Sequence, residues 1–153
     1  AWAMRIEIRR ATPTDSERAT ELARLAKAHW GYPAEWLAAW RDDLVISAEA
    51  IEKHRTFVAS MDGNVVGVCQ LQEGDVGAML EHVWVDPSVH GKGVGRALVE
   101  HAKSEARGVI AVVADPNAER FYIKLGAKRV GDVSAPMPGA PARKLPLLEF
   151  DRR

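Results

Sequence analysis

The sequence has very little cysteine, because Cys69 is the only one among its 153 residues. A single cysteine excludes an internal disulfide and a zinc cluster built on cysteine ligands. No apolar run reaches the length of roughly 20 residues that a membrane-spanning helix needs. Lysine plus arginine and aspartate plus glutamate balance at 21 each, so we expect no broad basic surface for nucleic acid or for an anionic membrane.

No secretion signal is recognisable at the start of the chain, and a cytoplasmic location is therefore expected. The hydrophobic content of 47% is enough to build one domain with a substantial core. We predict a single domain over residues 1–153, without repeats or linkers. Ala1 to Ala3 precede Met4 and are interpreted as the remnant of an expression tag, so they carry no weight here.

The first third of the chain predicts one strand and three helices. Arg5 to Arg9 alternates as a short strand, and Thr14 with Glu17 predicts a capping box at the start of a helix. Trp36 to Leu44 has the spacing of a second helix, and Ser47 begins a short third one. The inward face of the first helix is expected to consist of Ala19, Leu22, Leu25, Ala26 and His29.

The middle of the chain predicts a hairpin, a further strand and a buried strand. Thr56 to Ser60 and Val65 to Gln72 are expected strands, and the Asp-Gly pair between them is a strong turn signal. A third strand follows and ends in a glycine-rich loop. Val109 to Ala114 is a continuous apolar run, as expected of a strand buried on both faces.

The end of the chain predicts one helix and two strands. The helix is expected from about Asn117 to Leu125, and Gly126 ends it. The strands are expected near Lys128 to Val133 and Leu145 to Phe150. The stretch between these strands, residues 134–142, is rich in proline and glycine and predicts a loop.

The glycine-rich loop is the most informative segment. Val83, Trp84 and Val85 favour extended backbone, Pro87 ends the strand, and three glycines at alternate positions let the main chain approach a ligand closely. Helical spacing follows to about Ala106. A helix that begins on such a loop turns unpaired N–H groups and the positive end of its dipole toward the loop. The segment therefore predicts a phosphate-binding site.

Two common phosphate loops do not fit this segment. A Walker A loop needs Ser or Thr after its Gly-Lys pair, whereas Lys92 is followed by Gly93. In the dinucleotide fingerprint G-x-G-x-x-G the third glycine comes one residue later than Gly95 does here. That fingerprint also usually follows the first strand of its unit, whereas roughly half of this chain precedes the loop.

The segment resembles the acetyl-CoA loop of the GCN5-related N-acetyltransferases (GNAT). In that family a strand ending Val-x-Pro leads into Arg/Gln-x-x-Gly-x-Gly/Ala. His90, Gly93 and Gly95 occupy these last places, and the histidine departs from the pattern. A neutral histidine still donates one N–H, so it keeps a means of contacting phosphate.

A second segment, residues 115–127, is similar to another signature of the family, commonly Asn-x-x-Ala-x-x-Phe-Tyr-x-x-x-Gly-Phe. The residues that match in register are Ala118, Phe121, Tyr122 and Gly126. The family's asparagine falls on Asp115, and Asn117 follows two residues later. The resemblance therefore carries the CoA-contacting role to Asn117.

The resemblance implies a fold, a co-substrate and a reaction. The fold is α/β (α+β), with a mixed, mostly antiparallel sheet of six to seven strands that is flanked by helices and splayed where CoA enters. Acetyl-CoA is the co-substrate, a primary amine is the acceptor, and transfer is direct through a ternary complex. No metal is expected, because the histidines lack ligand spacing. The residues expected to contact CoA are Val83, Trp84, Val85, His90, Gly91, Lys92, Gly93, Val94, Gly95, Arg96, Asn117 and Tyr122.

Acetyl transfer to an amine calls for a base at the ammonium and a proton for the departing thiolate. Strand parity places Glu81 on the face of Val83, so Glu81 is predicted as the base, and His82 is the second choice. The resemblance implies that Tyr122 is the acid, or a hydrogen-bond donor, for the thiolate. A main-chain N–H near Val83 or Trp84 is expected to polarise the thioester carbonyl. The structural alternatives are a strand-edge ion pair for Glu81 and core packing for Tyr122.

Other residues admit simpler interpretations. Cys69 lies in an apolar strand and is expected to be a packed thiol rather than an acyl carrier. Four aromatic residues gather around the first two helices, the region that shapes the acceptor pocket in this family: Trp30, Tyr32, Trp36 and Trp40. They fit either core packing or, beside Asp42 and Asp43, a cage that attracts a cationic amine.

Several functions remain open at this point. The first choice is an N-acetyltransferase acting on a small amine. The alternatives are a CoA-binding sensor or regulatory module that has lost turnover, and an enzyme that acetylates a protein N-terminus or lysine. A homodimer is also left open.

Overall fold

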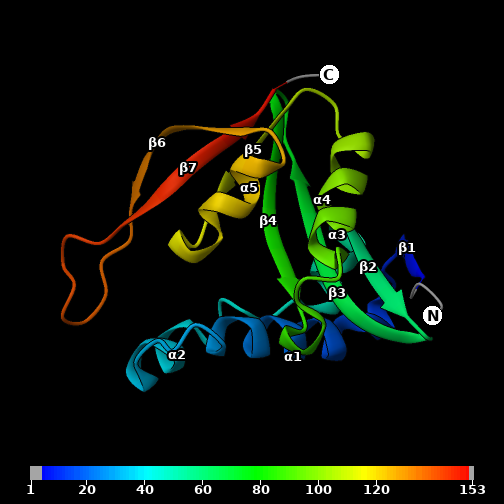
Figure 1. The fold of residues 1–153 in the computed structure, drawn as a ribbon, viewed down its shortest axis with the longest axis horizontal. Helices are drawn as coiled ribbons and strands as arrows, with labels where there is room; N and C mark the ends of the chain where they lie inside the picture. Colours follow the sequence, from blue (N-terminus) through cyan, green and yellow to red (C-terminus); the bar gives the residue numbers. More distant parts are fainter. Residues whose placement is uncertain (1–4, 152–153) are drawn as a thin grey trace.

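The computed structural model describes residues 5–151, and the tag-like residues Ala1 to Ala3 lie outside that range. A seven-stranded sheet has the order β1-β2-β3-β4-β5-β7-β6 (Figure 1). The strands are β1 (Ile6–Arg10), β2 (Arg55–Met61), β3 (Asn64–Glu73), β4 (Gly77–Val85), β5 (Val109–Val113), β6 (Ala127–Ser134) and β7 (Lys144–Phe150). The α-helices are α1 (Ser16–Ala28), α2 (Ala34–Trp40), α3 (Ala48–Lys53), α4 (Val94–Glu105) and α5 (Glu119–Lys124). No α-helix within this range is long and apolar enough to cross a membrane.

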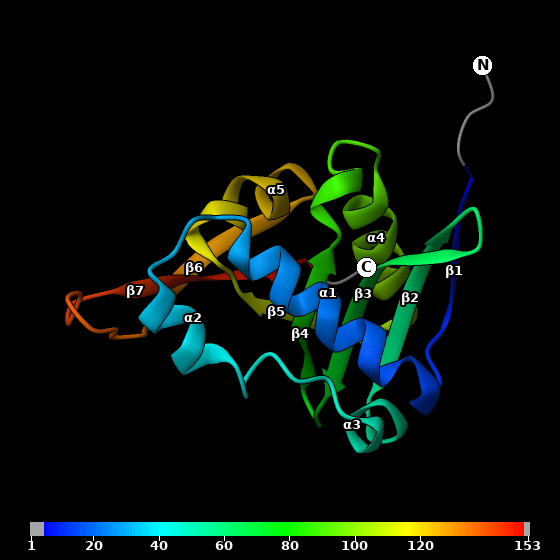
Figure 2. The same ribbon diagram turned by 90° about the horizontal axis from the view of Figure 1, so that it is seen from below.

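Helices cover the sheet on both faces, and each face has its own core. α1 lies across β3 and β4 on one face, and α4 and α5 lie on the other (Figure 2). The core under α1 includes Leu22, Ile46 and Val68, and the core under α4 includes Leu71 and Leu98, all almost fully buried. The layers follow from the alternation of apolar side chains along the central strands.

The sheet is mixed and opens between β4 and β5. These strands are the parallel pair, and they are paired only where Gly77 to Met79 meet Val109 to Ala111. Every other neighbouring pair in the sheet is antiparallel. Beyond Met79 the two strands diverge, so the β5-facing edge of β4 has no strand partner up to Val85. The predicted mostly antiparallel sheet and its splay are confirmed.

The predicted hairpin between β2 and β3 is confirmed. Asp62 and Gly63 have φ angles of +51° and +78°, as a two-residue turn with both central residues in the left-handed region requires. The turn matches the right-handed twist of the strands it joins.

The predicted start of the first helix is wrong. The capping box is formed by Thr12 and Asp15 around a 3-10 turn, because Pro13 sets the first turn two positions earlier and Asp15 accepts from the Thr12 N–H at 2.8 Å. α1 then begins at Ser16. Of the predicted inward face, Ala19, Leu22 and Ala26 are buried, whereas Leu25 is 44% exposed and His29 is also exposed; Ala23, which was not predicted, is fully buried.

Two further expectations need correction. The second helix ends at Trp40, and Leu44 reaches the core from a turn beyond it. β5 is fully buried only at Ile110 and Val112, while its other residues are half-buried. The face of β5 on the α1 side of the sheet is less covered, because α1 lies over β3 and β4 and not over β5 (Figure 2).

Candidate functional site

The glycine loop has the backbone conformation that a phosphate loop needs. Gly91 and Gly93 have φ angles of +81° and +86°, and Gly93 caps α4 without a side-chain hydrogen bond. Among the described residues, nothing lies within 4 Å of a Cβ built at either position. These glycines are therefore required by their left-handed conformation, which other residues adopt at a cost. The free N–H groups at the start of α4 point toward the loop.

Gly95 has a different role in the same segment. A Cβ built at Gly95 would lie 3.1 Å from Cζ of Phe121 and 3.5 Å from Cγ2 of Val85. The absence of a side chain thus lets the first turn of α4 pack closely against α5 and the end of β4. This close packing forms one wall of a cavity.

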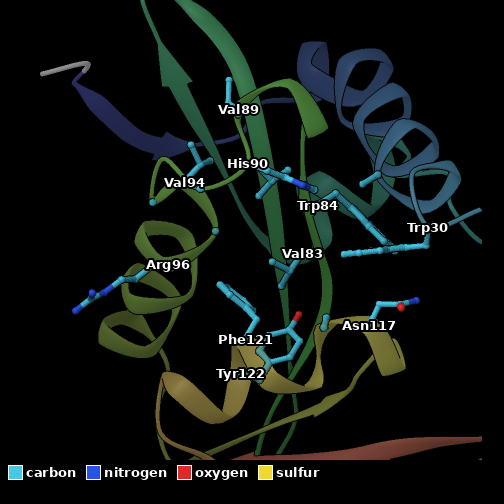
Figure 3. A pocket seen from close by; sticks show the side chains of 16 residues that line it. Trp30, Val83, Trp84, Val89, His90, Val94, Arg96, Asn117, Phe121 and Tyr122 are labelled. Carbon is cyan, nitrogen blue, oxygen red and sulfur yellow. The ribbon is translucent and has the colours of Figure 1, made fainter.

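A cavity of about 490 Å³ lies between the glycine loop, the end of β4, α5 and the end of α1 (Figure 3). It is lined by eleven of the twelve residues expected to contact CoA: Val83, Trp84, Val85, His90, Gly91, Gly93, Val94, Gly95, Arg96, Asn117 and Tyr122. Lys92 is exposed and does not line it; its N–H donates to the Val89 carbonyl at 3.3 Å. The lining residues that sequence reasoning missed are Ala26, Trp30, Val89, Ala118 and Phe121.

Trp30 is the most informative of the missed residues, because it comes from the turn after α1 rather than from either motif. The rings of Trp30 and His90 are nearly parallel, with centroids 6.4 Å apart, and the His29 and His90 rings meet edge-on at 4.9 Å. The end of α1 therefore holds the histidine that stands where the family has Arg or Gln. No signal in the local sequence placed α1 beside this loop, whereas Val89, Ala118 and Phe121 could have been found inside the motifs.

Glu81 lies at a β-bulge in β4. Leu80 pairs with Leu71 and His82 pairs with Gln70, so Glu81 is the extra residue without a partner on β3. The assumption of regular alternation is wrong here, because a bulge resets the alternation of side chains. Glu81 is exposed and does not line the cavity, and within residues 5–151 it makes no hydrogen bond or ion pair. The bulge lies just past the last β4–β5 pair, where the splay begins.

His82 lies on the α1 side of the sheet. Its Nδ1 accepts a hydrogen bond from Nε1 of Trp84 at 2.9 Å. Burial lowers the pKa of His82 to about 4, so its ring is neutral at pH 7. With one nitrogen occupied and the charged form disfavoured, His82 is poorly suited to take a proton from an ammonium group.

Tyr122 is buried, at 5% exposure, and its hydroxyl points into the cavity toward Val83 (Figure 3). Burial, with contributions from the nearby Cys69 and Asp115, raises the pKa of Tyr122 well above its usual value. Its hydroxyl is therefore protonated at neutral pH and can act as a donor. Cys69 is fully buried, its pKa is raised to about 12 by burial, and its thiol is correspondingly poor as a nucleophile.

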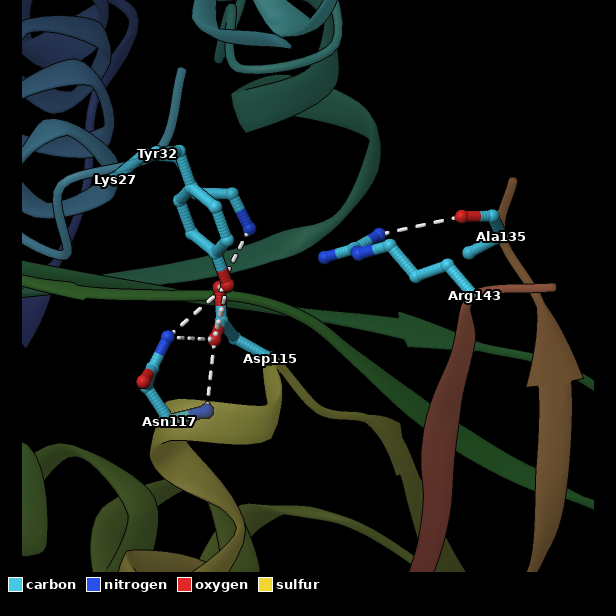
Figure 4. A network of polar contacts seen from close by, with 6 residues as sticks. All are labelled: Lys27, Tyr32, Asp115, Asn117, Ala135 and Arg143. Carbon is cyan, nitrogen blue, oxygen red and sulfur yellow. Dashed lines mark hydrogen bonds and ion pairs between the residues drawn. The ribbon is translucent and has the colours of Figure 1, made fainter. Parts of the chain in front are cut away.

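Asp115, in the place of the family's asparagine, connects three segments around the cavity (Figure 4). It pairs with Nζ of Lys27 at 2.7 Å, accepts from the Tyr32 hydroxyl at 2.9 Å and accepts from the Asn117 backbone N–H at 2.9 Å. Burial by itself would raise the pKa of Asp115, but Lys27 and these hydrogen bonds outweigh it and lower the pKa. The same carboxylate helps burial raise the pKa of Tyr32 to about 12.

Asn117 donates from Nδ2 to the Tyr32 hydroxyl at 3.0 Å and to Asp115 at 2.9 Å. With Nδ2 occupied in this way, Oδ1 is the side-chain group of Asn117 that can serve the cavity as an acceptor.

Three of the four aromatic residues form a box, and the chain's own cations occupy it. Tyr32, Trp36 and Trp40 contact each other with ring centroids 5.0–5.8 Å apart. Nζ of Lys27 lies 4.3 Å from the Trp40 centroid, and Cζ of Arg143 lies 5.3–5.8 Å from all three centroids. Asp42 and Asp43 are exposed. Within the described part of the chain, no group of three or more His, Cys, Asp or Glu residues is arranged to hold a metal.

Comparison with known proteins agrees with this arrangement. The family model described as an acetyltransferase (GNAT) domain matches residues 52–126. The solution structure of YjaB from Escherichia coli is 30% identical, with a TM-score of 0.69, and the match covers 95% of this chain and 96% of that one. The chain belongs to the GNAT family. The residues matched by the GNAT model, 52–126, include the glycine loop and α5.

Two other proteins show how far the similarity extends. The peptidyl-lysine N-acetyltransferase YjaB of Salmonella typhimurium is 39% identical over 80 residues, which are 44% of this chain and 55% of that protein. The match thus spans about half the length of this curated relative. The PaiA N-acetyltransferase of Thermoplasma acidophilum, solved with coenzyme A, has a TM-score of 0.74 at 21% identity, covering 97% of this chain and 99% of that one. At 21% identity, the comparison with the PaiA N-acetyltransferase shows that the fold is shared.

Proposed function

We propose that this chain is a single acetyltransferase domain that moves an acetyl group from acetyl-CoA to a primary amine, by direct transfer in a ternary complex. The observation that carries the proposal is the cavity. It joins the free N–H groups at the start of α4, the unpaired edge of β4 and the Tyr122 hydroxyl in one space. A pyrophosphate at the glycine loop would direct the thioester along β4 toward Tyr122.

The proposed roles follow from the chemistry of each group. Glu81, acting through water because its side chain is exposed, takes the proton from the ammonium. A main-chain N–H of β4 near Val83 stabilises the oxyanion as the new C–N bond forms. Tyr122 gives its proton to sulfur as the C–S bond breaks and regains one from solvent. The raised pKa of Tyr122 keeps the hydroxyl protonated, so it can donate a hydrogen bond to the developing thiolate.

The acceptor is proposed at the level of a primary amine. A small amine is our first choice, and the name of the YjaB relative, a peptidyl-lysine N-acetyltransferase, supports lysine in a peptide as the second. The CoA-binding sensor remains the rival from another class. We also propose that the protein acts in the cytoplasm.

The decisive experiment measures binding and turnover separately. Acetyl-CoA should raise the melting temperature of the wild type, by mass action. Gly93→Trp should lose most of this shift, because its side chain would stand at the cavity and its φ of +86° disfavours a side chain. A wild type whose melting temperature acetyl-CoA leaves unchanged would refute the placement of the site.

Turnover is then followed across small amines, amino acids and lysine peptides. Glu81→Gln and Tyr122→Phe should each lower kcat by roughly a hundredfold, as loss of general acid–base catalysis does, while the Kd of acetyl-CoA changes little. Glu52→Gln is the matched control, because Glu52 is an exposed carboxylate on α3, and this variant should leave kcat unchanged. Near-normal rates in both site variants would assign the proton transfers to other groups. Tight acetyl-CoA binding without any acceptor would favour the sensor.

A further inference from the structure

Arg143 occupies the aromatic box that the sequence suggested for a cationic ligand. It lies immediately before β7, and its Cζ is 5.8 Å from the ring centroid of Tyr32 and 5.3 Å from those of Trp36 and Trp40. A guanidinium stacks well on aromatic faces. Because the chain supplies this cation itself, the box is not free to receive the ammonium group of an acceptor.

The box fixes the β6–β7 loop against α2. Nε1 of Trp36 donates to the Pro138 carbonyl at 2.9 Å, and Nη1 of Arg143 donates to the Ala135 carbonyl at 3.4 Å (Figure 4). α2 has no fully buried residue, so these contacts with the β6–β7 loop help to keep α2 in position. Figure 2 shows α2 and the β6–β7 loop extending together beyond the end of the sheet.

The box is also adjacent to the cavity. The Tyr32 ring forms one side of the box, and its hydroxyl accepts from Nδ2 of Asn117, which lines the cavity, at 3.0 Å. The Tyr32 side chain therefore links Arg143 to Asn117 in the wall of the cavity. An acceptor whose amine reaches the thioester could contact Arg143 with a group a few bonds away.

The charge of Arg143 has no counterpart within the described residues. The arginines at positions 9, 18, 55 and 129 each pair with a carboxylate, and Lys27 beside the box pairs with Asp115. Arg143 makes no ion pair, and its Nη2 is buried without a hydrogen-bond partner. A buried donor left unpaired is unfavourable, and a cation even more so.

We propose that Arg143 is a specificity-determining residue that binds a carboxylate of the amine acceptor, a proposal that rests on the acetyltransferase function above. Nη1 already donates to Ala135, but Nη2 has no partner and leaves the guanidinium an N–H group for a charge-assisted hydrogen bond to a carboxylate. The aromatic box holds the guanidinium in place before the acceptor arrives. The neighbouring Ala142 and Lys144 are exposed, so we expect the acceptor to approach Arg143 from the loop side.

The carboxylate can belong to a free amino acid or to an acidic residue beside a lysine in a peptide. Two pairs of probes separate these sources. One pair is L-lysine and L-lysinamide, and the other is a blocked peptide with Glu or Gln next to its lysine. With acetyl-CoA saturating, the preferred carboxylate probe should have a kcat/KM roughly 10- to 100-fold above its neutral partner, the value of one charge-assisted contact.

Variants of Arg143 test the assignment. Arg143→Gln should abolish the preference mainly by raising KM for the carboxylate probe, with the neutral probe and the Kd of acetyl-CoA unchanged. Arg143→Lys should keep part of it, because a positive charge remains without the planar guanidinium that the box holds in place. Arg107→Gln, an exposed arginine at the end of α4, is the control and should match the wild type.

A binding measurement makes the test independent of turnover. N-acetylglycinate should quench the tryptophan fluorescence of the wild type at lower concentration than N-acetylglycinamide does, and Arg143→Gln should remove the difference. Equal response to the charged and neutral probes in both assays would overturn the proposal for Arg143. Absence of acetylation with every probe, while the binding difference persists, would instead count against the acetyltransferase function and leave the carboxylate contact established.

Discussion

Replacing Asp115 by asparagine makes the chain more like its family, yet we expect it to destabilise the protein. Asp115 and Lys27 are only 10% and 12% exposed at their side chains, and their charged atoms lie 2.7 Å apart. Asparagine can still accept hydrogen bonds from Tyr32 and from the Asn117 N–H. It leaves the Lys27 ammonium without a counter-charge in a largely buried place.

The magnitude follows from the burial. Removing one partner of a buried ion pair costs about 3–5 kcal/mol. Lys27 keeps its 4.3 Å contact with Trp40 in the variant and its side chain is 12% exposed, so the cost falls toward the lower end of this range. We therefore expect Asp115→Asn to lower the free energy of unfolding by about 2–4 kcal/mol. For a domain of this size the melting temperature falls by about 2–4 °C per kcal/mol, so a loss of roughly 5–15 °C is expected.

Urea unfolding followed by circular dichroism measures the change. The double variant Lys27→Met/Asp115→Asn should recover most of the loss, because replacing both charges removes the unpaired ion. Asp151→Asn is the control, since the Lys128–Asp151 pair is 74% and 78% exposed and should contribute nothing measurable. The lowered pKa of Asp115 adds a pH signature. The contribution of the Lys27–Asp115 pair to the free energy of unfolding should be complete above the ordinary pKa of an aspartate. It should disappear as pH falls through the lowered pKa of Asp115. A single variant as stable as the wild type would refute the reasoning.

Three further predictions concern the core and the strands. Gly67→Ala places a Cβ 2.8 Å from both Leu98 and Val94, so it should cost about 1–3 kcal/mol in urea unfolding, whereas Gly131→Ala, with 3.9 Å of space, should not. Burial lowers the pKa of His82 from 6.5 to about 4, so stability should be lost as pH falls through that window, by roughly 3 kcal/mol in all. An unfolding curve as pH-dependent in His82→Leu as in the wild type would contradict this. The buried Cys69 thiol should react with a thiol reagent only in denaturant, and Cys69→Ala should keep acetyl transfer; a native-state reaction or an acetylated thiol would refute it.

The success of the sequence predictions depended on whether a feature was local. The hairpin at Asp62 and the left-handed glycines of the loop were predictable, because turn chemistry and backbone conformation are properties of a few adjacent residues. The capping box was misplaced because Thr12 and Thr14 both offer a hydroxyl near an acidic residue three positions on, and only Pro13 favours the former. The bulge at Glu81 was not predicted, for a different reason. A bulge depends on the pairing with the neighbouring strand, which the residues of one strand do not specify.

The sequence by itself determined the order of elements, the glycine loop and the family, since these depend on the local spacing of residue types. Tertiary structure decided which distant side chains complete the site. Trp30 reaches the glycine loop, and Trp36 contacts Pro138 across 102 positions of sequence. Arg143 fills the aromatic box. Such contacts arise when helices and loops pack on the two faces and the open end of the splayed sheet. Their partners are selected by shape and charge in space, and no periodicity along the chain encodes them.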